Sequence, residues 1–246
     1  MAIVEKNNKP WFVKSATGPV NKIQERPEID RPKLRKLLAE SLPKSMIKWG
    51  HRLREITQEG ILIFEHTIIS GFDLVIGADE AWSKTGIGLY GMSIPNAAET
   101  ALNVNKLTNR GSVFANSDEK RLTIQRMGDG SLTVYASTVA GGGEDWASLN
   151  VCGHDSDDLE AVKKALLILY QDWSSELTEA IVKAAGNCSP RSLYMLPVGF
   201  RWSHRRGATV IRDAAHLMTP FAGKSVNAAL EDAMKLADAI IGAVAK

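Results

Sequence analysis

The chain has 246 residues, of which 44% are hydrophobic and 24% charged, and its formal net charge is +2. This length and composition are typical of a globular protein with one large domain or two small ones. The charge is too small, and lysines and arginines too scattered, for the basic surface that nucleic acid requires.

The sequence gives no sign of a leader, a membrane span or a metal site. The first fourteen residues are polar and lack the apolar centre of a signal peptide, and no apolar run reaches the roughly 18–20 residues of a membrane span. The two cysteines, Cys152 and Cys188, are far apart, and the five histidines include no pair with helical metal-ligand spacing. We therefore expect a cytoplasmic protein that binds no metal, no nucleic acid and no membrane.

The first informative stretch, Pro27–Leu38, is typical of a helix start. Asp30 is a good N-cap, and Pro32 occupies a first-turn position where proline is tolerated. Arg31 therefore lies in the first turn, where a cation opposes the helix dipole. Such a cost is often tolerated for an anionic ligand, and a solvated arginine is the alternative. Arg35, about one turn later, is open to both interpretations.

Short strands are expected next. Trp11–Val13 forms one, and two apolar runs, Ile61–Glu65 and Phe72–Asp79, are bounded by glycine and polar turns as strands are. The first of these runs is compatible with a strand that has one face exposed to solvent. The second is almost continuously apolar and ends in an acid, as a strand covered on both faces would.

Residues 87–150 predict a mostly antiparallel sheet. Four strands are expected there, and Asp129-Gly130 is a strong hairpin signal between the last two. Helical spacing follows over 157–186, with Gly186 as the expected stop. The acidic cluster His154–Asp158 just before it is interpreted as a turn and helix N-cap, with a metal site as the alternative.

The last stretch, Gly207–Asn227, predicts a strand, a loop and a long helix. The β-branched run Thr209–Ile211 is followed by an acid, Asp213, then by a turn at Gly223 and by helical apolar spacing from Val226. A loop before a helix N-terminus can offer backbone N–H groups to an anion. The acid could accept hydrogen bonds from a sugar hydroxyl.

Three of these stretches together resemble one family. It is that of the FAD-dependent aromatic hydroxylases, single-component flavoprotein monooxygenases that include salicylate-hydroxylase-like and tetracycline-inactivating enzymes. Pro27–Arg31 resembles the family's Pro-Glu-Ile-Asn/Asp-Arg. Asp73–Ser83 resembles Asp-Leu-Val-Ile-Gly-Ala-Asp-Gly-Ala-x-Ser, and Asp213–Asn227 resembles Asp-Ala-Ala-His followed by Pro-Phe-Ala-Gly-x-Gly-x-Asn.

The resemblance implies an FAD site. Arg31 and Asp213 would contact the cofactor, and Gly223 and Asn227 would frame the loop on its flavin side. The flavin would carry out the oxygen chemistry, with NADPH or NADH as reductant, while the protein positions a small aromatic or polyketide-like substrate. The resemblance assigns no catalytic residue.

The resemblance also implies an α/β (α+β) fold of two parts. Residues 1–86 and 201–246 would form a Rossmann-like FAD-binding domain ending in a long C-terminal helix. Residues 87–200 would form a substrate domain, with a mostly antiparallel sheet and helices. The family's Gly-x-Gly-x-x-Gly segment does not occur in the sequence, so the FAD-binding domain is expected to be truncated by a first βαβ unit of roughly 70–100 residues.

Further departures bear on function. Arg212, Ser225 and Glu80 replace family glycines, and the arginine that follows the Asp73–Ser83 stretch is absent. Without the βαβ unit, the strands at 60–79 and 208–211 would keep an open edge and an exposed apolar face.

Two hypotheses therefore stand beside each other. One is an FAD- and NAD(P)H-dependent monooxygenase of secondary metabolism. The other is a truncated, inactive homologue that acts at most as an interaction protein. The sequence leaves the oligomeric state open.

Overall fold

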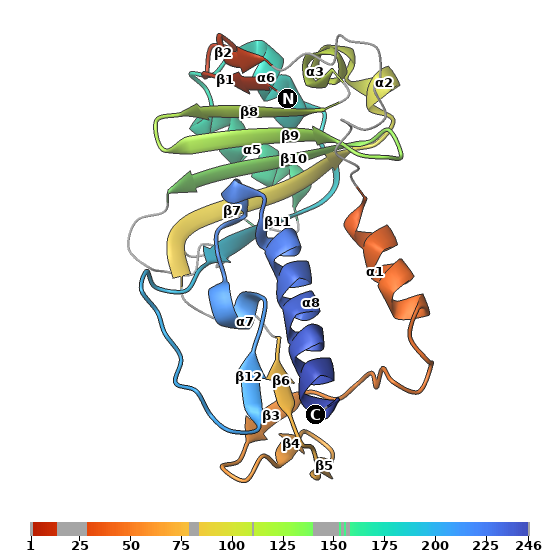
Figure 1. The fold of residues 1–246 in the computed structure, drawn as a ribbon. Helices are drawn as coiled ribbons and strands as arrows, with labels where there is room; N and C mark the ends of the chain where they lie inside the picture. Colours follow the sequence, from red (N-terminus) through yellow and green to blue (C-terminus); the bar gives the residue numbers. More distant parts are fainter. Residues whose placement is uncertain are drawn as a thin grey trace. The chain divides into compact units, whose positions relative to one another are not determined.

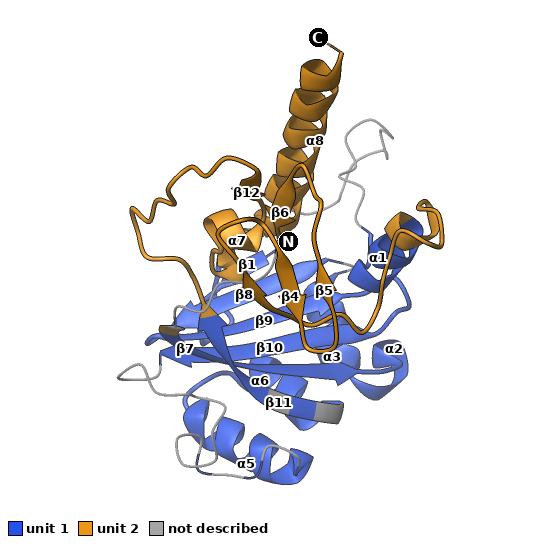
Figure 2. Ribbon diagram, turned by 90° about the horizontal axis from the view of Figure 1, so that it is seen from below, with its two compact units in different colours: residues 1–37, 86–193 blue, residues 38–85, 194–246 orange. Residues whose placement is uncertain are grey.

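The computed structural model describes residues 2–13, 29–78, 84–109, 111–139, 153, 155 and 158–245. The chain divides into two compact units (Figure 2). Residues 1–37 and 86–193 form the sheet unit, and residues 38–85 and 194–246 form the helix unit. The described part of 1–37 thus groups with the sheet, whereas the sequence-based division placed it in the FAD-binding part. The division by function stays a prediction, and each unit is described by itself.

A seven-stranded sheet within the described residues forms the sheet unit, in the order β11-β7-β10-β9-β8-β1-β2 (Figure 1). Strands β7, β10, β9 and β8 pair antiparallel, and β1 runs parallel to β8. The predicted antiparallel sheet is confirmed. The strands are β1 Ala2–Val4, β2 Pro10–Val13, β7 Lys84–Ile94, β8 Ser112–Ser117, β9 Lys120–Arg126, β10 Leu132–Val139 and β11 Ala185–Tyr194.

The turn between β9 and β10 is the predicted Asp129-Gly130 hairpin. Gly130 has φ +87°, a left-handed conformation that glycine adopts without strain. The Asp129 carboxylate accepts hydrogen bonds from the Ser131 hydroxyl at 2.7 Å and the Ser131 N–H at 2.9 Å. These bonds lower the pKa of Asp129. The turn fixes the register, in which Leu132 lies opposite Arg126.

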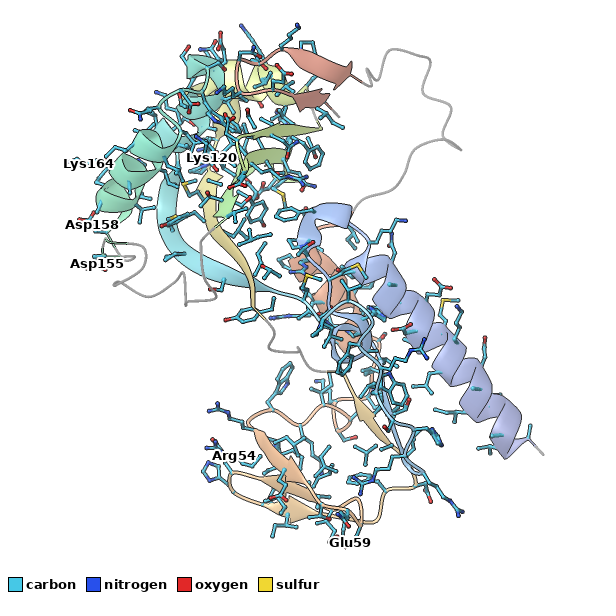
Figure 3. All side chains as sticks on the ribbon, turned by 90° about the vertical axis from the view of Figure 1, so that its left-hand side faces the viewer. Arg54, Glu59, Lys120, Asp155, Asp158 and Lys164 are labelled. Carbon is cyan, nitrogen blue, oxygen red and sulfur yellow. The ribbon has the colours of Figure 1, made fainter. Side chains whose placement is uncertain are left out.

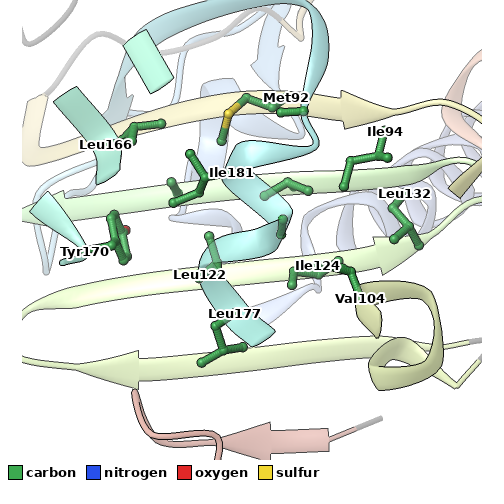
Figure 4. Close-up of a cluster of buried hydrophobic side chains, with 14 of the residues drawn as sticks. Met92, Ile94, Val104, Leu122, Ile124, Leu132, Leu166, Tyr170, Leu177 and Ile181 are labelled. Atoms are coloured by element: carbon green, nitrogen blue, oxygen red, sulfur yellow. The ribbon is translucent and has the colours of Figure 1, made fainter. Parts of the chain in front are cut away.

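Helices cover one face of this sheet and enclose the core with it (Figure 4). Successive side chains of a strand point to opposite faces, so alternate residues of β7, β9 and β10 are buried against the helices. The described core lies in this unit and includes Met92, Ile94, Val104, Leu122, Ile124, Leu132, Leu166, Tyr170, Leu177 and Ile181. The helices are α2 Ala97–Thr100, α3 Leu102–Thr108, α5 Leu159–Leu169 and α6 Ser175–Val182.

Local sequence signals succeed at one end of the helical stretch and fail at the other. Asp158, labelled in Figure 3, is the N-cap of α5, and its carboxylate accepts the N–H groups of Glu160 and Ala161 at 3.0 and 3.1 Å. The predicted helix stop at Gly186 is wrong. Helix α6 ends at Val182, and β11 begins at Ala185 because the chain there pairs beside β7. Helices α2 and α3 were not predicted.

The helix unit consists of two small sheets and a long C-terminal helix. Strands β3, β4 and β5 form an antiparallel sheet, and β6 pairs parallel with β12. Helix α1, Arg31–Glu40, begins in the sheet unit and crosses into this one at Leu38. The elements are β3 Leu53–Ile56, β4 Leu62–Phe64, β5 Ile68–Ile69, β6 Val75–Gly77, β12 Ala208–Val210, α7 Asp213–His216, the 3-10 helix η2 Pro220–Ala222 and α8 Ser225–Val244.

The helix unit exposes apolar surface that such elements normally bury. Parallel strands usually have both faces covered, yet Ile76 in β6 is 42% exposed. The prediction that Phe72–Asp79 is covered on both faces is therefore wrong for its described part. Within the described residues, β6 and β12 form a sheet of two strands, so the predicted open edge and exposed apolar face are confirmed there. No residue of α8 is buried.

No helix in the described ranges combines the length and the apolar character needed to cross a membrane. Among the same residues, no three His, Cys, Asp or Glu side chains gather as a metal site would require.

Candidate functional site

The segment after β12 holds three of the four predicted site residues, on consecutive elements of the helix unit. Asp213 is the first residue of α7, Gly223 ends η2, and Asn227 lies in the first turn of α8. The pairing with β6 positions this segment, since the Ile211 N–H donates to the Gly77 carbonyl at 2.9 Å. Asp213 thus follows the carboxyl end of a parallel strand, where open parallel sheets place their ligand crevices.

Gly223 shapes the entry into α8. Its backbone is left-handed, with φ +62°, and its N–H donates to the Pro220 carbonyl at 3.0 Å. A Cβ added at Gly223 would meet no atom within 4 Å. Conformation, and not crowding, therefore favours glycine there. The residue before α8, Lys224, makes no side-chain cap, so first-turn N–H groups of α8 are available to an anion.

Arg212, which replaces a family glycine, has a backbone conformation that suits glycine. Its φ is 58° and its ψ is −140°, in a region that other residues rarely adopt. The Arg212 guanidinium Nη2 lies 3.7 Å from Asp213 Oδ2. The carboxylate predicted to meet a sugar hydroxyl therefore already faces a cation in the described structure.

Asp232, on α8, contributes contacts that sequence reasoning missed. Its Oδ2 accepts the Arg212 N–H at 2.9 Å and lies 2.5 Å from His216 Nε2. Burial alone would raise the pKa of Asp232, but the hydrogen bonds from Arg212 and His216 outweigh it and lower the pKa. Nothing in the sequence indicates the pairing, because 16 residues and a loop separate His216 from Asp232.

Arg31, the fourth predicted residue, lies in the sheet unit. It is exposed at the first position of α1 and lines a pocket of about 850 Å³. The start of α1 lies close to the β9–β10 turn, since a Cβ at Gly128 would come within 3.0 Å of Asp30 Oδ2. The pocket is lined by Ile29, Asp30, Arg31, Pro32, Lys33, Gln125, Arg126, Met127, Gly128, Thr133 and Tyr135.

The sheet supplies one wall of this pocket. Gln125, Thr133 and Tyr135 alternate along β9 and β10 with the buried Ile124 and Val134. Their side chains therefore lie on the face opposite the helices. The pocket offers polar groups and one aromatic ring beside the Arg31 cation, a combination suited to a polar planar molecule.

The remaining predicted features are not all described. Residues 79–83 of the stretch Asp73–Ser83, which include Glu80, lie outside the described ranges. The other predicted residues divide between the units, with Arg31 in the sheet unit and Asp213, Gly223 and Asn227 in the helix unit.

No protein-family model matches the sequence. Monooxygenase penA of Penicillium thymicola is 26% identical over 96% of this chain and 65% of its own length. Monooxygenase asqM of Emericella nidulans is 28% identical over 87% of this chain and 61% of its own. The crystal structure of Klebsiella pneumoniae HpxO, complexed with FAD and uric acid, is 16% identical and has a TM-score of 0.71 over 94% of this chain and 60% of that one.

In sequence the chain is similar to the monooxygenases penA and asqM, and its fold is similar to that of HpxO, which was crystallised with FAD. The resemblance inferred from the motifs is thereby confirmed, and so is the mixed α/β fold with its long C-terminal helix. The chain spans less than two thirds of the length of penA and asqM.

Proposed function

We propose that the chain binds FAD and takes part in hydroxylating a small aromatic or polyketide-like molecule, with NADPH or NADH as reductant and O2 as co-substrate. The observation that carries the proposal is the arrangement after β12. An acid follows a parallel strand, and a left-handed glycine leads into the uncapped start of a 20-residue helix. The kinship with monooxygenases supports it.

The residues of this segment fit the cofactor's chemistry. The Asp213 carboxylate is 19% exposed and can accept hydrogen bonds from ribityl hydroxyls. The first-turn N–H groups of α8, beside Gly223 and Asn227, suit the negative charge of a pyrophosphate. Arg31 offers a cation that can contact phosphate oxygens. When bound, FAD supplies the activation of oxygen.

The pocket of the sheet unit supports the substrate part of the proposal. Tyr135 offers a ring for stacking against a planar molecule. Gln125 and Thr133 offer donors and acceptors that can orient its substituents. HpxO, which shares the fold, was crystallised with uric acid, a small planar molecule.

A second candidate function is that of an interaction protein without cofactor. It is favoured by the strained Arg212 at a glycine position and by apolar side chains that α8 leaves open. Met234, Ile241 and Val244 are 68%, 66% and 83% exposed. Exposed apolar surface of this kind often marks a site of protein association.

FAD binding separates the two candidates. We expect the purified 246-residue chain, mixed with FAD and desalted, to retain flavin absorbance between about 350 and 500 nm. A chain that emerges colourless and leaves flavin fluorescence unchanged during a titration would overturn the first candidate for this polypeptide. Consumption of NADPH or NADH by the coloured protein would then be measured with and without planar aromatic compounds.

Two variants test the assigned contacts. Asp213→Ala removes a charged acceptor and is expected to weaken FAD binding about 10- to 100-fold. Arg31→Ala is expected to weaken it about 10-fold, the effect of one charge-assisted contact. Asp238→Ala on α8 and Arg191→Ala on β11 remove exposed side chains of the same type, and both should keep the wild-type affinity. Equal losses in a variant and its control would refute that contact.

A further inference from the structure

One carboxylate oxygen contacts both ends of the short helix α7. Asp232 Oδ2 accepts the Arg212 N–H, one residue before Asp213, and meets His216 Nε2 at the last residue of α7. The carboxylate belongs to α8, whose first turn carries Asn227. The Asp232 side chain therefore joins two parts of the candidate site. One is the α7 turn that carries Asp213, the candidate ribityl contact, and the other is α8, whose first turn is the candidate anion site.

The backbone at Arg212 needs such a link. A residue with a Cβ stays at φ 58° and ψ −140° only where the surrounding contacts hold it there. Glycine would adopt the same conformation unaided. The Arg212 N–H donates to Asp232 Oδ2 at 2.9 Å, and this hydrogen bond from α8 helps to hold the residue in that conformation.

The surroundings of the His216 ring favour the tautomer that donates a hydrogen bond to Asp232. Within the described residues, Nδ1 of His216 is buried and has no hydrogen-bond partner. A proton on Nδ1 would therefore be a buried donor without an acceptor, which is costly. We assign the proton of neutral His216 to Nε2, so that the ring donates to Asp232.

We propose that Asp232 is a positioning residue for Asp213. By holding Arg212 and His216 together, it keeps α7 in the conformation that presents the Asp213 carboxylate to the cofactor. The part that concerns the cofactor rests on the proposed function. The part that concerns the strained turn does not, so the two can fail separately.

Charged side chains near Asp232 come from both the α7 turn and α8. The Arg212 guanidinium lies by Asp213, and Lys235 lies one turn along α8, where it forms an ion pair with Glu231 at 2.6 Å. Removal of Asp232 takes away two hydrogen bonds and a negative charge from the turn.

The test compares Asp232→Ala, Arg212→Gly and the double variant, first without FAD. Hydrogen exchange of the amides at 211–217 is followed by mass spectrometry. Asp232→Ala is expected to speed this exchange about tenfold, as for the loss of one to two hydrogen bonds. The double variant is expected to regain part of the lost protection, because glycine adopts this conformation without strain while the His216 contact stays lost. Loss of helix stability alone would not be rescued by a change at Arg212.

Asp232→Asn provides the conservative rescue. Its amide oxygen can still accept both hydrogen bonds, so it should retain most of the protection that Asp232→Ala loses. Asp238→Ala is the matched control on α8. If Asp232→Ala also deprotects α8 itself, His216→Phe decides instead. It removes one contact, keeps a ring in place, and should deprotect 211–217 alone.

The FAD titration is the second readout. In the chain that binds FAD, Asp232→Ala should weaken binding about tenfold and the double variant should restore it in part. Unchanged exchange at 211–217 in Asp232→Ala, or a double variant no better than the single one, overturns the positioning role. A chain that shows the exchange pattern but never binds FAD overturns the proposed function and leaves the held turn in place.

Discussion

At the scale of single residues, backbone conformation separates glycines that the fold requires from those it tolerates. Gly223 is left-handed with φ +62°, whereas Gly242 lies within α8. A Cβ at either position would meet no atom within 4 Å. Any difference between their alanine variants therefore reports conformation and not crowding.

We expect the two substitutions to have opposite signs. Gly223→Ala forces an L-residue into the left-handed region and should destabilise the protein by about 1–2 kcal/mol. Gly242→Ala should stabilise it by about 0.5–1 kcal/mol, because alanine favours a helix interior. Urea unfolding followed by circular dichroism measures both. Equal signs would contradict the conformational account of the Gly223 turn.

The residue scale also shows what a local signal can reveal. Asp129-Gly130 predicted its turn because the hydrogen bonds that make it lie within five residues, 127–131. Arg212 appeared in the sequence only as a departure from a family glycine. That it is strained, and that Asp232 accepts its N–H, depends on a helix 20 residues further along.

At the scale of elements, charged side chains attach the β1–β2 hairpin to the end of α5. Lys6 donates to Asp118 at 2.8 Å and to Asp172 at 2.9 Å, and Lys120, labelled in Figure 3, reaches Asp172 at 3.1 Å. The Lys6 carbonyl also accepts the Ser174 N–H at 2.7 Å. Hydrogen bonds from Lys6 and then Lys120 lower the pKa of Asp172 from 3.8 to about 2.

This shift predicts an acid dependence. A carboxylate whose pKa is lower in the folded state stabilises it above the ordinary pKa, and that contribution is lost as the pH falls through the folded pKa. For Asp172 the loss falls between pH 3.8 and about 2. In thermal unfolding over this range, Asp172→Asn should flatten the dependence of the midpoint on pH, and added salt should flatten it in wild type.

Glu176→Gln serves as the control, since it removes an exposed carboxylate on α6. If Asp172→Asn shows the same slope as wild type, then Asp172 does not supply the acid dependence.

The pattern of apolar residues led to a wrong prediction of burial at one strand. Residues 72–79 are apolar enough for a strand with both faces covered, and β6 does form there and pairs parallel with β12. The sequence pattern records a preference for burial but not whether a covering layer is present. Ala185–Tyr194 shows the reverse case, where strand pairing overrides Gly186 as a helix stop.

At the scale of the whole molecule, the two units differ in how much apolar surface they bury. The described core residues all lie in the sheet unit, whereas α8 has no buried residue. Local stability follows buried contacts and protected hydrogen bonds. The two units should therefore open with different free energies.

Hydrogen exchange in the native protein tests this difference. Amides of β9 and β10 should exchange at least about 100-fold more slowly than those of α8, because their opening requires disruption of the core. Added FAD should slow exchange in α8 more than in β9 and β10, if the proposed site is correct. Equal protection of α8 and β10 without ligand would contradict the unequal packing of the units.

The sequence by itself determined the resemblance to FAD-dependent monooxygenases, the antiparallel sheet with its hairpin, the long last helix and the residues to examine for FAD. Those features depend on short-range chemistry, namely alternation along strands, helical spacing, and ordered motifs at Arg31 and Asp213–Asn227. The tertiary structure alone decided which strands pair, that α1 begins beside the pocket of the sheet unit, and that Asp232 contacts both ends of α7. Those features depend on residues that are distant in sequence and meet only when the chain is folded, so no local pattern records them.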